Sequence, residues 1–104
     1  MNSVGVALIV TLAVTINGTA LSAGDVDNGE HLARRWCSSC HLVAADQLQA
    51  SADVPPFSVI ARMPNFITEK VAFFLLDPHP KMPNLALSRR EADDIAAYIG
   101  SLVK

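Results

Sequence analysis

The stretch of sequence that decides the fold is Trp36-Cys37-Ser38-Ser39-Cys40-His41, a C-x-x-C-H run. Cysteines three residues apart lie on neighbouring positions of one helical turn, so both thiols can reach the two vinyl groups on one edge of a porphyrin. The adjacent histidine is then directed at the iron. This spacing is typical of a c-type haem attachment site, in which one helical turn supplies three bonds to one cofactor.

Three other chemistries use paired cysteines. A thioredoxin-like redox pair starts a helix after a strand, whereas here a helical pattern precedes the pair and no segment is rich in strand signals. A zinc site needs about four ligands, and only His31 and His79 remain as further candidates. A disulfide between Cys37 and Cys40 would close a very short loop and stabilise the fold little. We therefore favour covalent haem.

Length and composition set the class of protein. The 104 residues suffice for one small domain, and with 51% hydrophobic and 17% charged residues the chain is too apolar to be disordered. The net charge of −2 argues against a nucleic-acid binder, because phosphate contacts need a basic surface. Small domains usually need a staple or a cofactor to supplement a modest core, and the haem would supply it.

The first 23 residues differ from the rest of the chain. Residues 1–23 contain no Lys, Arg, Asp or Glu, and their apolar core at 4–16 is followed by a polar break at 17–19 and a run of small residues. This pattern predicts a secretory signal peptide cleaved after Ala23 or one residue earlier. A membrane anchor is the alternative, but a spanning helix wants about 20 predominantly apolar residues. We expect an exported, periplasmic domain over 24–104 with no membrane span after processing.

Hydrophobic periodicity and capping residues predict three helices and one further helical turn, over residues 27–40, 68–76, 88–103 and 56–62 respectively. The first helix is expected to open with Asp27 as the N-cap and Glu30 as its capping-box partner. The last opens with Ser88 and Glu91, which form the same motif. Pro78 is expected to end the middle helix, because a residue before proline avoids the helical conformation.

One glycine predicts how the first and last helices meet. Gly inside a helix costs about 1 kcal/mol relative to Ala, so a neighbour should need the missing side chain of Gly29. The last helix carries an apolar stripe made of Ile95, Tyr98, Ile99 and Leu102. We expect this helix to cross the first one closely at Gly29, with Leu32, Ala33 and Trp36 on the apolar face of the first helix.

In their order these motifs resemble the small monohaem class I cytochromes c of bacteria, over essentially all of residues 25–104. The resemblance is carried by Gly29 eight residues before Cys37, the C-x-x-C-H run, the segment Pro80-Lys81-Met82-Pro83, and the helix sequence Ala92-Asp93-Asp94-Ile95-Ala96-Ala97-Tyr98-Ile99. It implies an all-α, class I cytochrome c-like fold, in which three to four helices wrap around one covalently bound haem.

The resemblance also implies the roles of individual residues. Cys37 and Cys40 would carry the thioether bonds, and His41 and Met82 would be the axial ligands of the iron. Ile95 with Tyr98 would pack on Gly29.

Other family features match this chain less closely. A proline carbonyl orients the ligand histidine in the family, a role that Pro55 or Pro56 matches loosely. Where family members use a Trp in the middle of the chain as a partner of a haem propionate, this chain offers Arg62 as a charge-assisted donor. Ala33 occupies a position that is often aromatic in the family.

The sixth ligand has three candidates. Pro80 and Pro83 flank Met82 and restrict its loop, which would hold a sulfur at fixed reach. Met63 follows a predicted helix end, and methionine in a small domain is more often a packing residue. His79 is expected to be a loop histidine near the surface. His31, on the polar face of the first helix, is expected to be solvated.

Coordination predicts function. An iron held by His and Met on its two axial faces has no open site for a substrate. The sequence therefore predicts a periplasmic carrier of single electrons, with donor and acceptor proteins as partners, without enzymatic activity of its own, and a monomer. Two alternatives stay open: a cytochrome subunit of a periplasmic dehydrogenase, and a gas-binding or catalytic haem protein with an open sixth position. Lys81, beside Met82, is expected to affect docking to an acidic partner.

Overall fold

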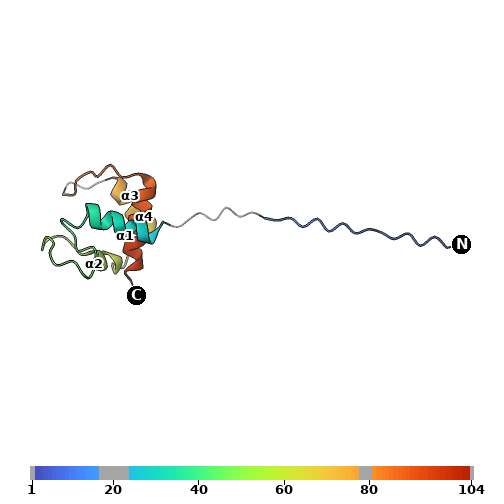
Figure 1. The fold of residues 1–104 in the computed structure, drawn as a ribbon, viewed down its shortest axis with the longest axis horizontal. Helices are drawn as coiled ribbons and strands as arrows, with labels where there is room; N and C mark the ends of the chain where they lie inside the picture. Colours follow the sequence, from blue (N-terminus) through green and yellow to red (C-terminus); the bar gives the residue numbers. More distant parts are fainter. Residues whose placement is uncertain (1, 17–23, 78–80, 104) are drawn as a thin grey trace.

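The computed structural model describes residues 2–16, 24–77 and 81–103, and its folded part is built from helices (Figure 1). In chain order they are α1 (Val26–Trp36), α2 (Phe57–Ala61), α3 (Thr68–Leu76) and α4 (Arg89–Ser101). The described ranges contain no strand, so the prediction of an all-α fold with three to four helices is confirmed. Helix α4 is the common element, because α1, α2 and α3 all pack against it.

The crossing of α1 and α4 depends on Gly29. A Cβ atom built at Gly29 would lie 1.9 Å from the carbonyl oxygen of Asp94 and 2.8 Å from the Cβ of Tyr98, so any side chain here would collide with the backbone of α4. The predicted close crossing is confirmed. Its contacts are Asp94 and Tyr98, while Ile95 lies beside them in the core and is fully buried.

The ends of α1 differ from the prediction. Its N-cap is Asp25 rather than Asp27, and the Asp25 carboxylate accepts a hydrogen bond from the backbone N–H of Asn28 at 3.1 Å. The backbone N–H of Asp25 in turn donates to Oδ1 of Asp94 at 2.7 Å, a contact with α4 that fixes where α1 begins. The helix ends at Trp36, so the two cysteines lie in the turn that follows it.

The start of α4 agrees with the prediction. The Ser88 hydroxyl accepts from the backbone N–H of Glu91 at 3.1 Å, and the Glu91 carboxylate accepts from the backbone N–H of Ser88 at 2.9 Å. This reciprocal capping box satisfies two backbone donors that the first turn of a helix leaves unpaired.

The core lies where α1, α2 and α4 meet. Its largest fully buried side chains are Ile95, Ile99 and Val43, and Phe57 of α2 is 3% exposed. Trp36, predicted to lie on the apolar face of the first helix, is not packed in this core. It is 44% exposed, and the Arg35 guanidinium lies 4.8 Å from the centre of its ring. Cys37, the next residue, takes the buried position at the end of the helix.

Residues 2–16 form neither a helix nor a strand, and every one of them is exposed (Figure 1). Among the described residues, no helix combines the length and the apolar character needed to cross a membrane. The predicted cleavage site and Pro78, His79 and Pro80 lie outside the described residues.

Candidate functional site

The C-x-x-C-H residues form a tight turn on the end of α1. The backbone N–H of Cys37 donates to Ala33 O at 2.8 Å and completes the helix. Cys37 O then accepts from the N–H groups of Cys40 and His41 at 3.2 and 2.9 Å. One carbonyl therefore closes the turn that holds both thiols and the histidine together.

The two cysteines have different surroundings. Both thiols are free, but Cys37 is 5% exposed within the core, whereas Cys40 is exposed. Burial is the main cause that raises the pKa of the Cys37 thiol to about 11, and the nearby Cys40 thiol is a smaller cause in the same direction. At neutral pH this thiol is therefore uncharged, and the pair is not joined by a disulfide.

The imidazole of His41 is oriented by a backbone carbonyl. Its Nδ1 lies 2.7 Å from Pro55 O, and because a carbonyl oxygen can only accept, Nδ1 carries the proton. The lone pair is then on Nε2, the tautomer in which a histidine binds a metal while its other nitrogen is held. Of the two candidate prolines, the structure thus selects Pro55. The ring of Phe57 packs beside the imidazole, with ring centres 5.2 Å apart.

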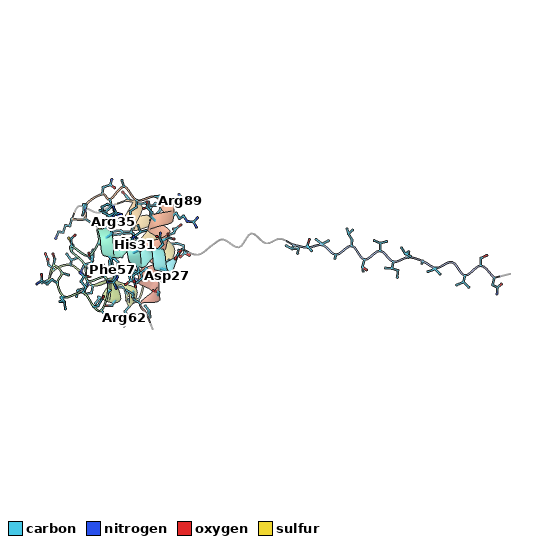
Figure 2. All side chains as sticks on the ribbon, viewed as in Figure 1. Asp27, His31, Arg35, Phe57, Arg62 and Arg89 are labelled. Carbon is cyan, nitrogen blue, oxygen red and sulfur yellow. The ribbon has the colours of Figure 1, made fainter. Side chains whose placement is uncertain are left out.

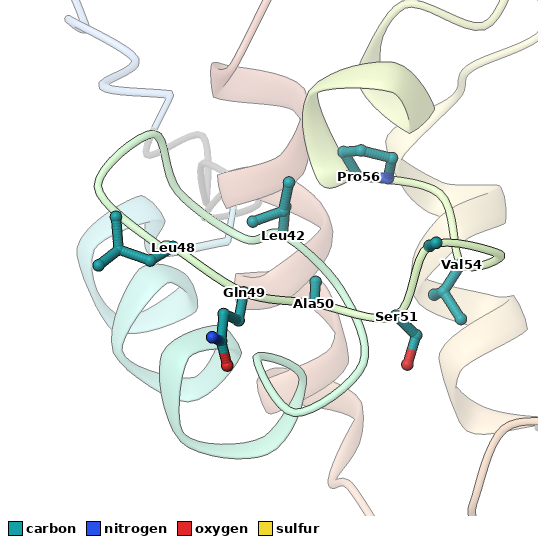
Figure 3. Close-up of a pocket in the computed structure, with 8 residues that line it drawn as sticks. Leu42, Leu48, Gln49, Ala50, Ser51, Val54 and Pro56 are labelled. Carbon is teal, nitrogen blue, oxygen red and sulfur yellow. The ribbon is translucent and has the colours of Figure 1, made fainter.

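The loop after His41 is tied back onto the turn. The N–H of Ser51 donates to Cys40 O at 3.0 Å, and the N–H of Phe57 donates to Leu42 O at 2.9 Å. The loop lines a pocket of about 470 Å³, shown in Figure 3, with Leu42, Val54 and Pro56 among its apolar side chains. The loop that follows His41 is thus closed by hydrogen bonds, and it lines a pocket of mixed apolar and polar character.

Met82 is half-buried in the segment that connects α3 to α4. Beyond it, the Asn84 carboxamide oxygen accepts from the N–H of Ala86 at 2.9 Å, and Ala86 adopts a φ of 52°. This left-handed residue turns the chain into α4, so the Met82 loop has a defined exit. Met63, the competing methionine, is 47% exposed just beyond the end of α2.

The remaining candidates do not gather at the turn. Arg62 caps the end of α2, and its Nη1 donates to Ser58 O at 2.9 Å. Figure 2 shows Arg62 and Arg89 at opposite ends of the folded body. His31 is exposed on α1, as predicted. A contact between Arg62 and a haem propionate stays a prediction.

Sequence reasoning missed two residues that shape this region. The Asp94 carboxylate is 3% exposed and accepts from the Asp25 N–H and from Asn28 Nδ2, both at 2.7 Å. It ties the start of α1 to α4. Gln47 lies in the loop after His41, and its carboxamide makes four hydrogen bonds with backbone groups of that loop and of the turn. No periodicity marks either residue. Asp94 accepts from a backbone N–H and from the Asn28 side chain, both far away in the sequence, and Gln47 bonds to backbone groups of an irregular loop and of the turn.

The donor set of the site fits haem c. The turn offers two free thiols at the attachment spacing and an imidazole with Nε2 available, and the α3–α4 connection offers a thioether sulfur. An all-α domain with these donors, whose first and last helices cross at a glycine, has the architecture of a small class I cytochrome c.

Comparison with known proteins agrees. The chain is 59% identical over 98 residues to cytochrome c-552 of Bradyrhizobium diazoefficiens, a match that covers 94% of this chain and 92% of the relative. The chain therefore belongs to the small monohaem class I cytochromes c, the electron-carrying proteins that hold haem c covalently. No family model matches the chain, and no solved structure matches it.

Proposed function

We propose that the protein is a periplasmic carrier of single electrons whose haem c is attached through Cys37 and Cys40 and ligated by His41 and Met82. The observation that carries the proposal is the 2.7 Å contact between His41 Nδ1 and Pro55 O, because it leaves Nε2 as the only ring nitrogen able to bind iron. The haem supplies the redox chemistry. The chain supplies burial, a rigid frame and the ligands.

Met82 is the proposed sixth ligand because of its position. It is half-buried in a loop with a defined exit, whereas Met63 is exposed at the end of α2. A thioether on one face and an imidazole on the other leave no coordination position for a substrate, and Met/His ligation raises the reduction potential. A site closed in this way transfers electrons and has no catalytic reaction of its own.

Export is supported by where the folded body begins. A Cβ atom at Gly24 would lie 2.2 Å from Asp93 O, so Gly24 already packs tightly on α4, while residues 2–16 are exposed and irregular. Cleavage after Ala23 would leave every contact of α1 with α4 intact. We propose that residues 1–23 are a signal peptide and that residues 24–104 are the mature, monomeric domain.

The redox partner is proposed to carry acidic residues. Lys81, Arg89 and Arg90 are exposed at the two ends of the segment that contains Met82, and no acidic residue lies between them. Within the described part of the chain, none of the three forms an ion pair. Arg89 and Arg90 also occupy the first turn of α4, where the helix dipole disfavours cations. An acidic surface docked here would relieve that unfavourable charge.

The proposal is tested by replacing each of the two methionines with alanine in a separate variant. Oxidised protein with Met82 on the iron should show a weak sulfur-to-iron charge-transfer band in the far red. Met82→Ala should abolish the band, lower the reduction potential and open the iron to cyanide, whereas Met63→Ala should leave the band in place. Loss of the band in Met63→Ala, with Met82→Ala unchanged, would show that the ligand assignment is wrong.

A further inference from the structure

We infer that Gln47 is a positioning residue, whose carboxamide holds the backbone of the C-x-x-C-H turn and thereby fixes the plane of the His41 imidazole. The inference rests on the proposed ligation of iron by His41. Gln47 belongs to no helix, and it is half-buried between the turn and the loop that follows it.

The contacts of Gln47 are the basis of this role. Its Oε1 accepts from the backbone N–H of Val43 at 2.9 Å. Its Nε2 lies 2.8 Å from three carbonyl oxygens, those of Ser38, His41 and Gln49. Two N–H groups serve these three acceptors, so one N–H is shared. A single side chain thus joins the middle of the cysteine turn to the histidine and to the loop beyond it.

Gln47 supplies one of three points that fix His41. The His41 N–H donates to Cys37 O at 2.9 Å, the His41 carbonyl accepts from Gln47 Nε2, and His41 Nδ1 contacts Pro55 O. The first and second hold the two peptide groups on either side of the Cα atom. Without the second, the peptide group that follows His41 loses its hydrogen bond, and the imidazole can tilt about its contact with Pro55 O.

The hydrogen bonds of Gln47 also connect the turn to the core. Val43, whose N–H donates to Gln47, is 1% exposed, and its carbonyl accepts from the Tyr98 hydroxyl of α4 at 2.5 Å. Tyr98 is the residue whose Cβ faces Gly29 at the helix crossing. Val43 and Gln47 therefore fix the position of the turn relative to the α1–α4 core.

Only a carboxamide satisfies all four partners at once. In Gln47→Glu the carboxylate can still accept from Val43 but faces the carbonyl oxygens of Ser38 and His41 without a proton to donate. In Gln47→Met the volume is kept and every hydrogen bond is lost. Gln49→Glu is the matched control, because its exposed side chain makes no hydrogen bond in the described structure and the charge change is the same.

The experiment compares wild type, Gln47→Glu, Gln47→Met and Gln49→Glu as haem-loaded proteins. Proton NMR of the oxidised state measures the haem-methyl shifts, which report the plane of the axial imidazole, and amide exchange is measured at His41 and Val43. Both Gln47 variants should alter the order or spread of the methyl shifts. Gln47→Met, which alone removes the acceptor of the Val43 N–H, should also speed exchange at Val43 about tenfold or more. Gln49→Glu should match wild type in both.

Two results would overturn the inference. One is an unchanged haem-methyl pattern in both Gln47 variants, whether or not their unfolding free energy falls, because a merely structural role lowers stability without turning the ring. The other is an equal change in Gln49→Glu, which would assign the effect to charge. A wild-type spectrum lacking the low-spin His/Met signature would instead contradict the proposed ligation, so the two failures are distinguishable.

Discussion

Replacing Gly29 by alanine perturbs the helix crossing on which the fold depends. The new Cβ would lie 1.9 Å from Asp94 O and 2.5 Å from Asp94 C, and neither backbone atom can move without moving α4. Restoring an ordinary contact of 3.4 Å requires α1 and α4 to separate by about 1.5 Å. A gap of about 0.5–1 Å already forfeits a quarter to a half of the dispersion energy between packed atoms.

The magnitude follows from opposing terms. Alanine gains about 1 kcal/mol of helix propensity over glycine. Against it stand an overpacking cost of about 1–3 kcal/mol and weaker contacts of Ile95, Tyr98 and Leu32 in the core. The two 2.7 Å hydrogen bonds of Asp94 to the start of α1 would also stretch. We expect Gly29→Ala to lower the free energy of unfolding by about 2–4 kcal/mol.

Gly100→Ala is the matched control. A Cβ there would lie 3.3 Å from the edge of the Phe66 ring, a side chain that can shift by a few tenths of an ångström. Both substitutions change the unfolded chain in the same way, so the difference between them reports the folded state. Guanidinium unfolding of the haem-loaded proteins, followed by circular dichroism, measures both free energies. If Gly29→Ala is no less stable than Gly100→Ala, the close crossing does not carry the fold.

Three further experiments, two substitutions and one mass measurement, test other parts of the structure. Asp94→Ala should lower the free energy of unfolding by about 2–3 kcal/mol, because it leaves the Asp25 N–H and the Asn28 side chain without their acceptor. Asp93→Ala removes an exposed carboxylate and should lower it by less than about 1 kcal/mol. Denaturant titration measures both, and equal losses would refute the role of the buried carboxylate. Lys81→Glu should slow electron transfer to an acidic partner about threefold or more in low salt, with a smaller loss in high salt. Lys70→Glu, near the other end of α4, is the control and should not slow it. Equal stopped-flow rates for the two variants would place docking on another face. The intact mass of the exported protein should equal residues 24–104 plus one haem; a haem-free mass with a Cys37–Cys40 disulfide would contradict covalent attachment.

The parts of the fold that sequence predicts well are those with local causes. The capping box of Ser88 and Glu91 and the helices near 68–76 and 88–103 depend on neighbouring residues, and the structure contains them. Gly29 was also predictable, because a glycine inside a helix has a propensity cost that a close contact explains.

Errors arose where distant residues decide between local alternatives. Asp25, Asp27 and Asn28 can all cap a helix, and the bond from Asp25 N–H to Asp94, 69 residues away, selects Asp25. Trp36 matches the apolar period of α1, but the helix ends there and Cys37 occupies the core instead.

The turn that holds the two cysteines and His41 could be recognised in the sequence, whereas the residues that support this turn could not. The five adjacent positions of a C-x-x-C-H run indicate haem attachment on their own. The structure holds both thiols and the imidazole on one turn. Gln47 acts through backbone carbonyls of a loop that has no periodicity, so its role has no signature in residue type or spacing. Pro55 could be separated from Pro56 only by the position of its carbonyl.

The most direct test of the account is the addition of carbon monoxide to the reduced, unmodified protein. The central claim is that His41 and Met82 close both axial faces of the iron, which makes the protein a carrier. The reduced absorption spectrum should then remain unchanged under carbon monoxide at neutral pH. Rapid formation of a carbon monoxide complex would show an open or labile sixth position and would contradict both the Met82 assignment and the carrier function.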